Sequence, residues 1–317
     1  MKSFFKAAAV AAAIAVTATG SLAQDWTPPG PITLMIGFAA GGGADTQARL
    51  IAEELQTRHG WEIIPENVTG RGGLNLANEM NGGPTDGTLI GIVVTETLGY
   101  NLAGAADANM SPSDFTGITT TAGFQMGVVS QTSRGWSSFE DMIAAAQAGE
   151  DIRFGAMSPR LADLAFLLGE AHGVNFNIVE VRGGRAVMDG VNAGDLDVGF
   201  MAGIQRNGVA AGDLVNLASA MTEPLVQTPD APIFPDLGVP FGGGGEFLII
   251  APAGLAPDAR EALSAAIIDI ISDPETDAGA LIARAFGGAT IISGEELDAH
   301  IQAGFDEAGA LISAVSE

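Results

Sequence analysis

The feature that most constrains the fold is an alternation of short apolar runs with segments of helical periodicity. The run ITLMIGF (32–38) is rich in β-branched residues, and residues 45–59 then place their apolar side chains at helical spacing. Similar runs at 61–66 and 87–94 flank a further helical segment, 75–83. Parallel strands need a crossover connection, usually a helix. The alternation therefore predicts an α/β fold with a mostly parallel sheet flanked by helices.

A second series of the same kind begins near residue 125, so the middle of the chain is expected to form its own α/β unit. The stretch 223–246 holds five prolines and a run of four glycines, which is typical of a loop. A further strand is expected at 247–254. We therefore expect domain 1 to comprise 24–124 and 247–317 and domain 2 to comprise 125–246, with the chain crossing twice.

The first 23 residues resemble a secretory signal. Lys2 and Lys6 precede an apolar, alanine-rich stretch, and Ser21 and Ala23 have the spacing that a signal peptidase requires. A membrane anchor is the alternative, but the stretch is short and no later segment approaches the roughly 20 apolar residues of a membrane span. We expect cleavage near Ala23 and export to the periplasm. Cysteine is absent, so the exported fold depends on its core rather than on disulfides.

Charge composition excludes several classes of function. The formal net charge is −25, which argues against binding to nucleic acid or to an anionic membrane surface. The 13 cationic side chains comprise Lys2, Lys6 and eleven arginines, so no lysine follows the signal. Without one, a P-loop lysine, Schiff-base chemistry and pyridoxal phosphate are all excluded, and no cofactor is expected.

The loop Gly41–Gly43 lies between the first apolar run and the first helical segment. Three adjacent glycines suggest a positive φ angle or close approach of a ligand to the main chain. A helix N-terminus there offers unpaired N–H groups and a positive dipole end to a carboxylate or phosphate. A tight turn without a ligand is the alternative. The spacing matches neither a dinucleotide fingerprint nor a P-loop.

Other candidate ligand groups also lie at strand ends and helix starts. Thr95 and Thr97 follow an apolar run, although threonines there often satisfy local backbone groups instead. Ser158 is a natural N-cap, and Arg160 in the first turn opposes the helix dipole, which suggests either a ligand anion or pairing with an acid such as Asp163.

Arg185 lies beside two glycines at another helix start, and Arg182 is the alternative to it as a ligand contact. The three histidines lie in polar, helix-like contexts, and no zinc-binding or G-x-S-x-G motif occurs. We expect no metal site and no catalytic step.

Five segments together resemble the substrate-binding proteins of tripartite tricarboxylate transporters, the Bug family. They are PITLMIGFAAGGGADTQARLIAEELQ, ENVTGRGGLN, PTDGTLIGIVV, AGDLDVGF and FLIIAPAGLAPDA, in that order, and the likeness covers essentially the whole chain after the signal. The resemblance implies a periplasmic two-domain clamshell that closes on a small carboxylate. It also implies delivery of that ligand to a permease of one large and one small membrane subunit.

The resemblance also implies contact regions. The loop Phe38–Asp45 would hold a carboxylate through backbone groups and ordered water, and the hydroxyl-bearing loop aligns with Val94, Thr95 and Thr97. The sequence departs from the family pattern at GAMSPRLAD and VRGGRAVMD, where arginines replace neutral donors. A direct bond from arginine to the carboxylate is therefore an alternative to the water-mediated contact that the resemblance implies.

The expected function is that of a monomeric periplasmic solute-binding protein for a small organic acid. The alternatives are a periplasmic sensor subunit and a hydrolase on the same scaffold. The expected ligand-binding residues are Phe38, Ala39, Ala40, Gly41, Gly42, Gly43, Asp45, Thr95, Thr97, Ser158, Arg160, Gly184, Arg185 and Gly203, the last in a loop (201–206) that helps to set the pocket volume.

Overall fold

The structure is a computed structural model that describes residues 26–316, and the expected signal peptide lies outside them. Two five-stranded sheets organise the chain. The first, sheet A, has the order β2-β1-β3-β10-β4 and comprises β1 (Ile32–Ile36), β2 (Ile63–Asn67), β3 (Leu89–Val94), β4 (Phe115–Phe124) and β10 (Gly245–Pro252). The second, sheet B, has the order β7-β6-β8-β5-β9 and comprises β5 (Gly127–Gln131), β6 (Arg153–Ala156), β7 (Asn177–Glu180), β8 (Val198–Met201) and β9 (Leu214–Ser219).

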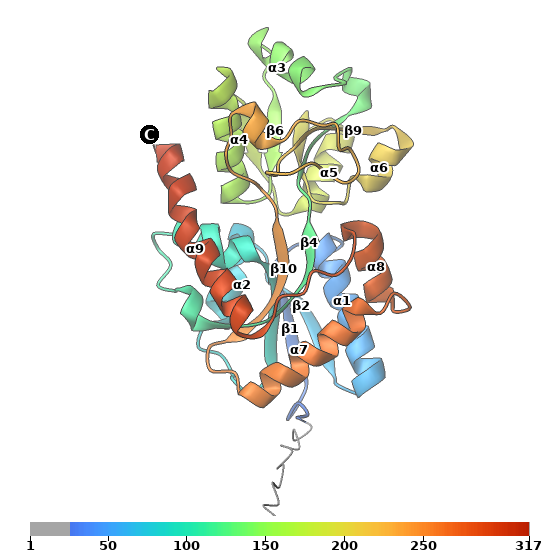
Figure 1. The fold of residues 1–317 in the computed structure, drawn as a ribbon, viewed down its shortest axis with the longest axis vertical. Helices are drawn as coiled ribbons and strands as arrows, with labels where there is room; N and C mark the ends of the chain where they lie inside the picture. The colour runs from blue at the N-terminus through green and yellow to red at the C-terminus, as the bar shows by residue number, and fades with distance from the viewer. Residues whose placement is uncertain (1–25, 317) are drawn as a thin grey trace, which may run out of the picture.

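The two sheets form the two lobes of the molecule seen in Figure 1. The chain passes from β4 to β5 and returns from β9 to β10, which confirms the α/β clamshell with two crossings. β4 and β10 pair antiparallel and run side by side toward the second lobe (Figure 1).

Each sheet is mixed rather than mostly parallel. In sheet A, β1 pairs parallel with β2 and β3, whereas β10 pairs antiparallel with β3 and β4. In sheet B, β6 pairs parallel with β7 and β8, whereas β5 pairs antiparallel with β8 and β9. The antiparallel pairs arise because the strands that enter and leave the second lobe run against the strands already there.

Helices cover both faces of sheet A, which explains why all six residues of β3 are buried. Helices α1 (Gly43–His59), α7 (Pro257–Ser272) and α8 (Asp277–Phe286) share one apolar cluster with the sheet. Helix α2 (Leu74–Met80) and the first turns of α9 (Gly294–Ser316) share a second cluster on the opposite face. The helices of the second lobe are α3 (Phe139–Gln147), α4 (Pro159–His172), α5 (Gly184–Ala193) and α6 (Arg206–Ala211).

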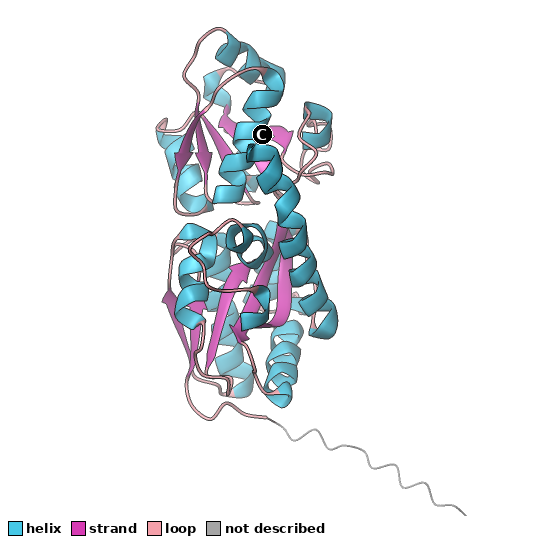
Figure 2. Cartoon of the chain, turned by 90° about the vertical axis from the view of Figure 1, so that its left-hand side faces the viewer, coloured by secondary structure: helices cyan, strands magenta, loops and turns pink. Residues whose placement is uncertain are grey.

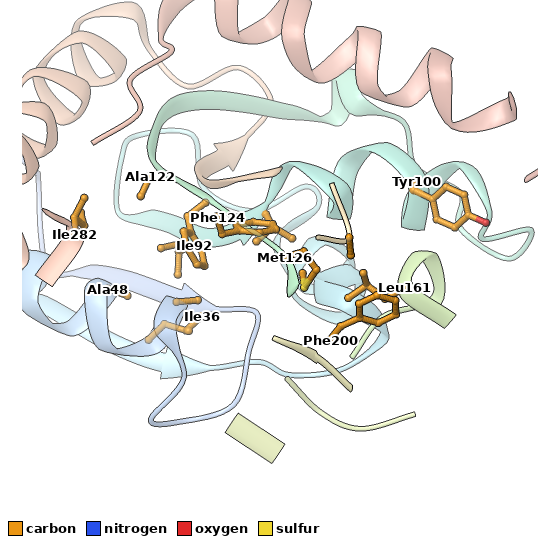
Figure 3. Packing of buried hydrophobic residues seen from close by; sticks show 14 of the residues in the cluster. Ile36, Ala48, Ile92, Tyr100, Ala122, Phe124, Met126, Leu161, Phe200 and Ile282 are labelled. Carbon is orange, nitrogen blue, oxygen red and sulfur yellow. The ribbon is translucent and has the colours of Figure 1, made fainter. Parts of the chain in front are cut away.

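Two features connect the lobes besides the crossing strands. Helix α9 packs on β4 and contacts α4 of the other lobe. Figure 2 shows this C-terminal helix running from one lobe to the other, where its end is marked C. The larger apolar cluster also continues from sheet A to sheet B, and Figure 3 shows Phe124, Met126 and Leu161 along this connection. The two lobes are therefore joined by packed side chains as well as by backbone.

Candidate functional site

A cleft between the lobes is divided into two connected cavities. The larger, which we call the polar lobe of the cleft, has a volume of about 890 Å³. The smaller, the apolar lobe of the cleft, has a volume of about 240 Å³. The residues that line both cavities, and so form their junction, are Phe38, Ala39, Gly72, Met157, Ser158, Arg182 and Gly183.

Three helices from both sides of the cleft begin in the wall of its apolar lobe, two of them at the junction. The N-cap residues of α1, α4 and α5 are Gly42, Ser158 and Gly183, and all three line the apolar lobe of the cleft. The first N–H groups of a helix have no partner within it, and the helix dipole places partial positive charge at that end. Three helix starts converging on one cleft make an electropositive region within a strongly acidic chain.

The glycine loop before α1 is held in shape by the helix that follows it. Gly41 has φ 78°, which favours glycine, and its N–H donates to Oδ2 of Asp45 at 2.9 Å. Oδ1 of the same carboxylate accepts from Arg49 Nε at 2.9 Å and from Asn67 Nδ2 at 2.8 Å. Asp45 therefore braces the loop and lines neither lobe of the cleft.

Electrostatics agree with a structural role for Asp45. Burial acts to raise its pKa, but the hydrogen bonds from Gly41, Asn67 and Arg49 outweigh burial and hold the pKa below its ordinary value. Asp45 is 4% exposed, and both of its carboxylate oxygens accept hydrogen bonds from these donors. It stays ionised at neutral pH and keeps the glycine loop in one conformation.

A second glycine turn, Gly70–Gly73, forms part of the cleft and was not among the expected site residues. Gly72 has φ 61° and lines both lobes of the cleft, and a Cβ there would lie 2.3 Å from Nδ2 of Asn101. The run GRGG was visible in the sequence as part of the family resemblance. The contribution of this turn to the cleft depends on tertiary contacts, because Asn101, which lies beside Gly72, is distant from it in sequence.

The two threonines expected at the site face elsewhere. Thr97 is fully buried, and its hydroxyl donates to the carbonyl of Gly72 at 2.7 Å. The hydroxyl of Thr95 bonds to the Glu246 carboxylate at 3.1 Å and accepts from the Glu246 N–H. Both satisfy protein groups, which was the alternative weighed for them, and neither lines the polar or the apolar lobe of the cleft.

The arginines expected to clamp a ligand already have partners in the protein. Arg160 donates to the carbonyls of Gly242 at 2.5 Å and Gly244 at 3.2 Å, on the connection that returns to β10, and lies 4.0 Å from Glu96. Arg185 lines the apolar lobe of the cleft, but its Nε pairs with Asp189 one turn further along α5 at 2.9 Å.

Arg182 differs from both. It precedes α5, is exposed, and lines both lobes of the cleft. No hydrogen bond or ion pair joins its guanidinium to another side chain or carbonyl within residues 26–316. Of the two alternatives raised by the sequence for this segment, Arg182 is the one whose cation is available at the junction.

The cleft brings together some of the expected site residues and not others. Those that line it are Phe38, Ala39, Gly41, Gly42, Gly43, Ser158, Gly184 and Arg185. Those that do not are Ala40, Asp45, Thr95, Thr97, Arg160 and Gly203. Gly203 lies just behind the wall, where a Cβ would be 2.9 Å from the carbonyl of Ala285. A role in ligand binding stays a prediction for all of them.

A hydrogen bond joins the two sides of the cleft at Tyr100, and another joins the two halves of the molecule where Arg206 on α6 donates to the carbonyl of Arg284 on α8 at 2.7 Å. The hydroxyl of Tyr100, from a short π-helical turn after β3, donates to the carboxylate of Asp163 on α4. Burial, followed by this hydrogen bond, raises the pKa of Tyr100, so the hydroxyl remains protonated. Sequence reasoning missed this pair, because residues 100 and 163 carry no local signal of proximity.

Two features typical of other protein classes are absent from residues 26–316. These residues contain no cluster of three histidine, acidic or cysteine side chains placed to bind a metal ion. The same part of the chain has no helix that is both long and apolar enough to cross a bilayer.

Residues 47–315 match the family model of the tripartite tricarboxylate transporter family receptor. A UPF0065 protein from the TAR-I ttuE-ttuC' intergenic region of Agrobacterium vitis is 27% identical over 263 residues, covering 80% of this chain and 74% of that protein. The sequence match therefore extends through both sides of the cleft.

Solved structures share the fold at lower sequence identity. The periplasmic binding protein BugD superposes with a TM-score of 0.80 at 19% identity, covering 92% of this chain and 99% of that one. MatC from Rhodopseudomonas palustris, solved with bound malate, superposes with a TM-score of 0.77 at 19% identity, covering 90% and 100%. By its family-model match, and in agreement with this shared fold, the chain belongs to the tripartite tricarboxylate transporter receptor family.

Proposed function

We propose that the protein captures a small organic carboxylate in the cleft between its two lobes and delivers it to the permease of a tripartite tricarboxylate transporter. The observation that carries the proposal is the convergence of the α1, α4 and α5 N-termini on the apolar lobe of the cleft, at and beside the junction. Backbone N–H groups from both lobes of the molecule would donate hydrogen bonds to the carboxylate there, and Arg182 would supply a full positive charge.

Family membership and one structural neighbour support this function. The family is named for a transporter receptor, and MatC was solved with malate bound. A ligand that contacts both lobes of the molecule favours the closed arrangement, because all of the ligand's contacts form only when the cleft is closed. In this proposal the membrane subunits, one large and one small, recognise the closed form.

The finer parts of the proposal follow the same reasoning. We propose that residues 1–23 direct export to the periplasm and that the protein acts as a monomer. We also propose domain boundaries of 24–124 with 247–317 for one domain and 125–246 for the other, which the membership of the two sheets supports. No catalytic step is proposed, because the family and its neighbours are solute-binding proteins.

A thermal-shift panel on the purified protein tests the proposal. Mono-, di- and tricarboxylates, amino acids and uncharged analogues of the same size would be compared at high concentration. A ligand at 100 times its Kd stabilises the fold by about 2.7 kcal/mol. Stabilisation by at least one carboxylate but not by its amide supports the proposal, and unchanged acid after prolonged incubation excludes the hydrolase. Absence of any shift across the acids overturns it.

A further inference from the structure

We propose that the ligand carries a single carboxylate on an apolar aliphatic or aromatic body, with that body in the apolar lobe of the cleft. This inference rests on the proposed function and names its substrate class. Apolar side chains dominate the wall beyond the junction, among them Met126, Leu161, Ile204, Phe124, Phe247 and Phe286. A ligand with an apolar body binds more tightly in such a cavity, because binding removes apolar surface of the ligand and of the cavity wall from water.

Three phenylalanine rings form one continuous wall of this cavity. The ring of Phe247 packs edge-on against Phe124, with centroids 5.2 Å apart, and against Phe286, with centroids 5.0 Å apart. A Cβ at Gly43 would lie 3.0 Å from Phe286. The aromatic wall thus begins beside the start of α1, so one small molecule reaches both the N–H groups and the rings.

Charges around the cleft disfavour a second carboxylate. Glu96 is buried in the wall of the apolar lobe of the cleft. Asp163 and Glu180 line the polar lobe of the cleft. A distal carboxylate in either direction would meet a protein carboxylate.

The other arginines that line the cleft already have acidic partners, because Arg185 in the apolar lobe of the cleft pairs with Asp189. Arg71 in the polar lobe of the cleft pairs with Asp107. Only the junction offers unpaired N–H groups together with the cation of Arg182.

The size of the apolar lobe sets the size of the ligand. Its volume is about 240 Å³. An apolar protein cavity of about 150 Å³ holds a benzene molecule. A phenyl ring with a short linker, or an unbranched chain of about six carbons, therefore fits with its carboxylate at the junction.

Matched pairs of acids test the inference by isothermal titration. Hexanoate and adipate have the same number of carbons and differ in the distal carboxylate, and 4-methylphenylacetate pairs in the same way with 4-carboxyphenylacetate. We expect each member with one carboxylate to bind at least about tenfold tighter than its partner. From butanoate to hexanoate, each added CH₂ should tighten binding about fourfold.

A variant of the aromatic wall separates tail recognition from general stability. Phe286→Ala should weaken hexanoate binding about tenfold while changing propanoate affinity by less than about twofold. Phe166→Ala is the matched control, because Phe166 is 41% exposed on α4 and lines neither lobe of the cleft. It should leave the affinities of both acids unchanged.

The outcomes distinguish the two proposals. Binding of adipate or malate as tight as that of hexanoate, or no gain with chain length, overturns the apolar-tail inference and leaves carboxylate capture intact. Binding of no acid at all overturns both. An equal loss for hexanoate and propanoate in Phe286→Ala also counts against the inference, because it would assign the ring to the fold of the cleft and not to the ligand tail.

Discussion

The N–H of Gly41 and the carboxylate of Asp45 are joined by a hydrogen bond of 2.9 Å, so the first turn of α1 holds the loop that precedes it. The loop can then present its remaining N–H groups to the cleft without further ordering on binding. Preorganisation of this kind lowers the entropic cost of ligand capture. The pair explains why an acid follows the three glycines although it never reaches the cleft.

The pH dependence of stability tests the hydrogen bonds by which the Asp45 carboxylate holds the glycine loop. Its pKa in the folded protein lies below that of the unfolded chain, about 3.9, so the ionised form favours folding. Its contribution is present above that value and is lost as the pH falls through the folded pKa. We expect Asp45→Asn to reduce the free energy of unfolding by about 1–3 kcal/mol at pH 7. Urea unfolding at several pH values should show this difference narrowing below about pH 4. A constant difference between pH 7 and pH 3 would contradict this role of the carboxylate.

Close approach of the glycine loop to the cleft is tested at Gly43. In Gly43→Val the new side chain would occupy space beside Phe286, where even a Cβ lies 3.0 Å from the ring. We expect ligand affinity to fall more than about tenfold while the protein remains folded, as checked by titration and circular dichroism. Gly309→Val is the control, because a Cβ at this exposed helical glycine meets no atom within 4 Å. Equal affinities in the two variants would rule out close approach at this loop.

Arg182 and Arg160 are expected to serve different purposes. Arg182→Ala should weaken carboxylate binding about 10- to 100-fold with little change in Tm, because it removes a charged donor from the junction. Arg182→Lys should recover only part of this, because an ammonium cannot form the bidentate fork.

Arg160→Ala is the matched comparison. It should lower Tm more than it weakens binding, because Arg160 holds the carbonyls of Gly242 and Gly244 and lies near buried Glu96. Titration and thermal melting of both variants provide the test. A loss of affinity confined to Arg160→Ala would restore the arginine clamp that the sequence suggested for that residue.

The hydrogen bond between Tyr100 and Asp163 joins the two lobes of the molecule in the absence of a ligand. In Tyr100→Phe this bond is lost while the ring remains, so the ligand-free protein should shift toward more open arrangements. We expect a larger radius of gyration by small-angle X-ray scattering. We also expect the Kd of the ligand to rise several-fold, because more of the binding energy is used to close the cleft. Because the pKa of the tyrosine is raised, both differences should persist from pH 6 to pH 9. Identical scattering from the two proteins would show that the bond does not influence closure.

Local sequence patterns determined the elements and much of the site. Apolar runs followed by helical periodicity placed β1, α1 and β3, because backbone geometry and side-chain periodicity are set by neighbouring residues. The glycines at 41–43 and the serine at 158 were found for the same reason, since a helix start has a local signature.

The partners of the charged side chains were decided only by the tertiary structure. Arg160 meets Gly242 and Gly244, more than 80 residues away in sequence, and Tyr100 meets Asp163 across the cleft. The antiparallel strands in both sheets likewise depend on where the chain returns after crossing. A long, flexible cation reaches whichever acceptors the fold brings near it, and no local pattern encodes that choice. The sequence therefore determined where an anion would meet helix starts, and only the fold decided which arginine remains available to it.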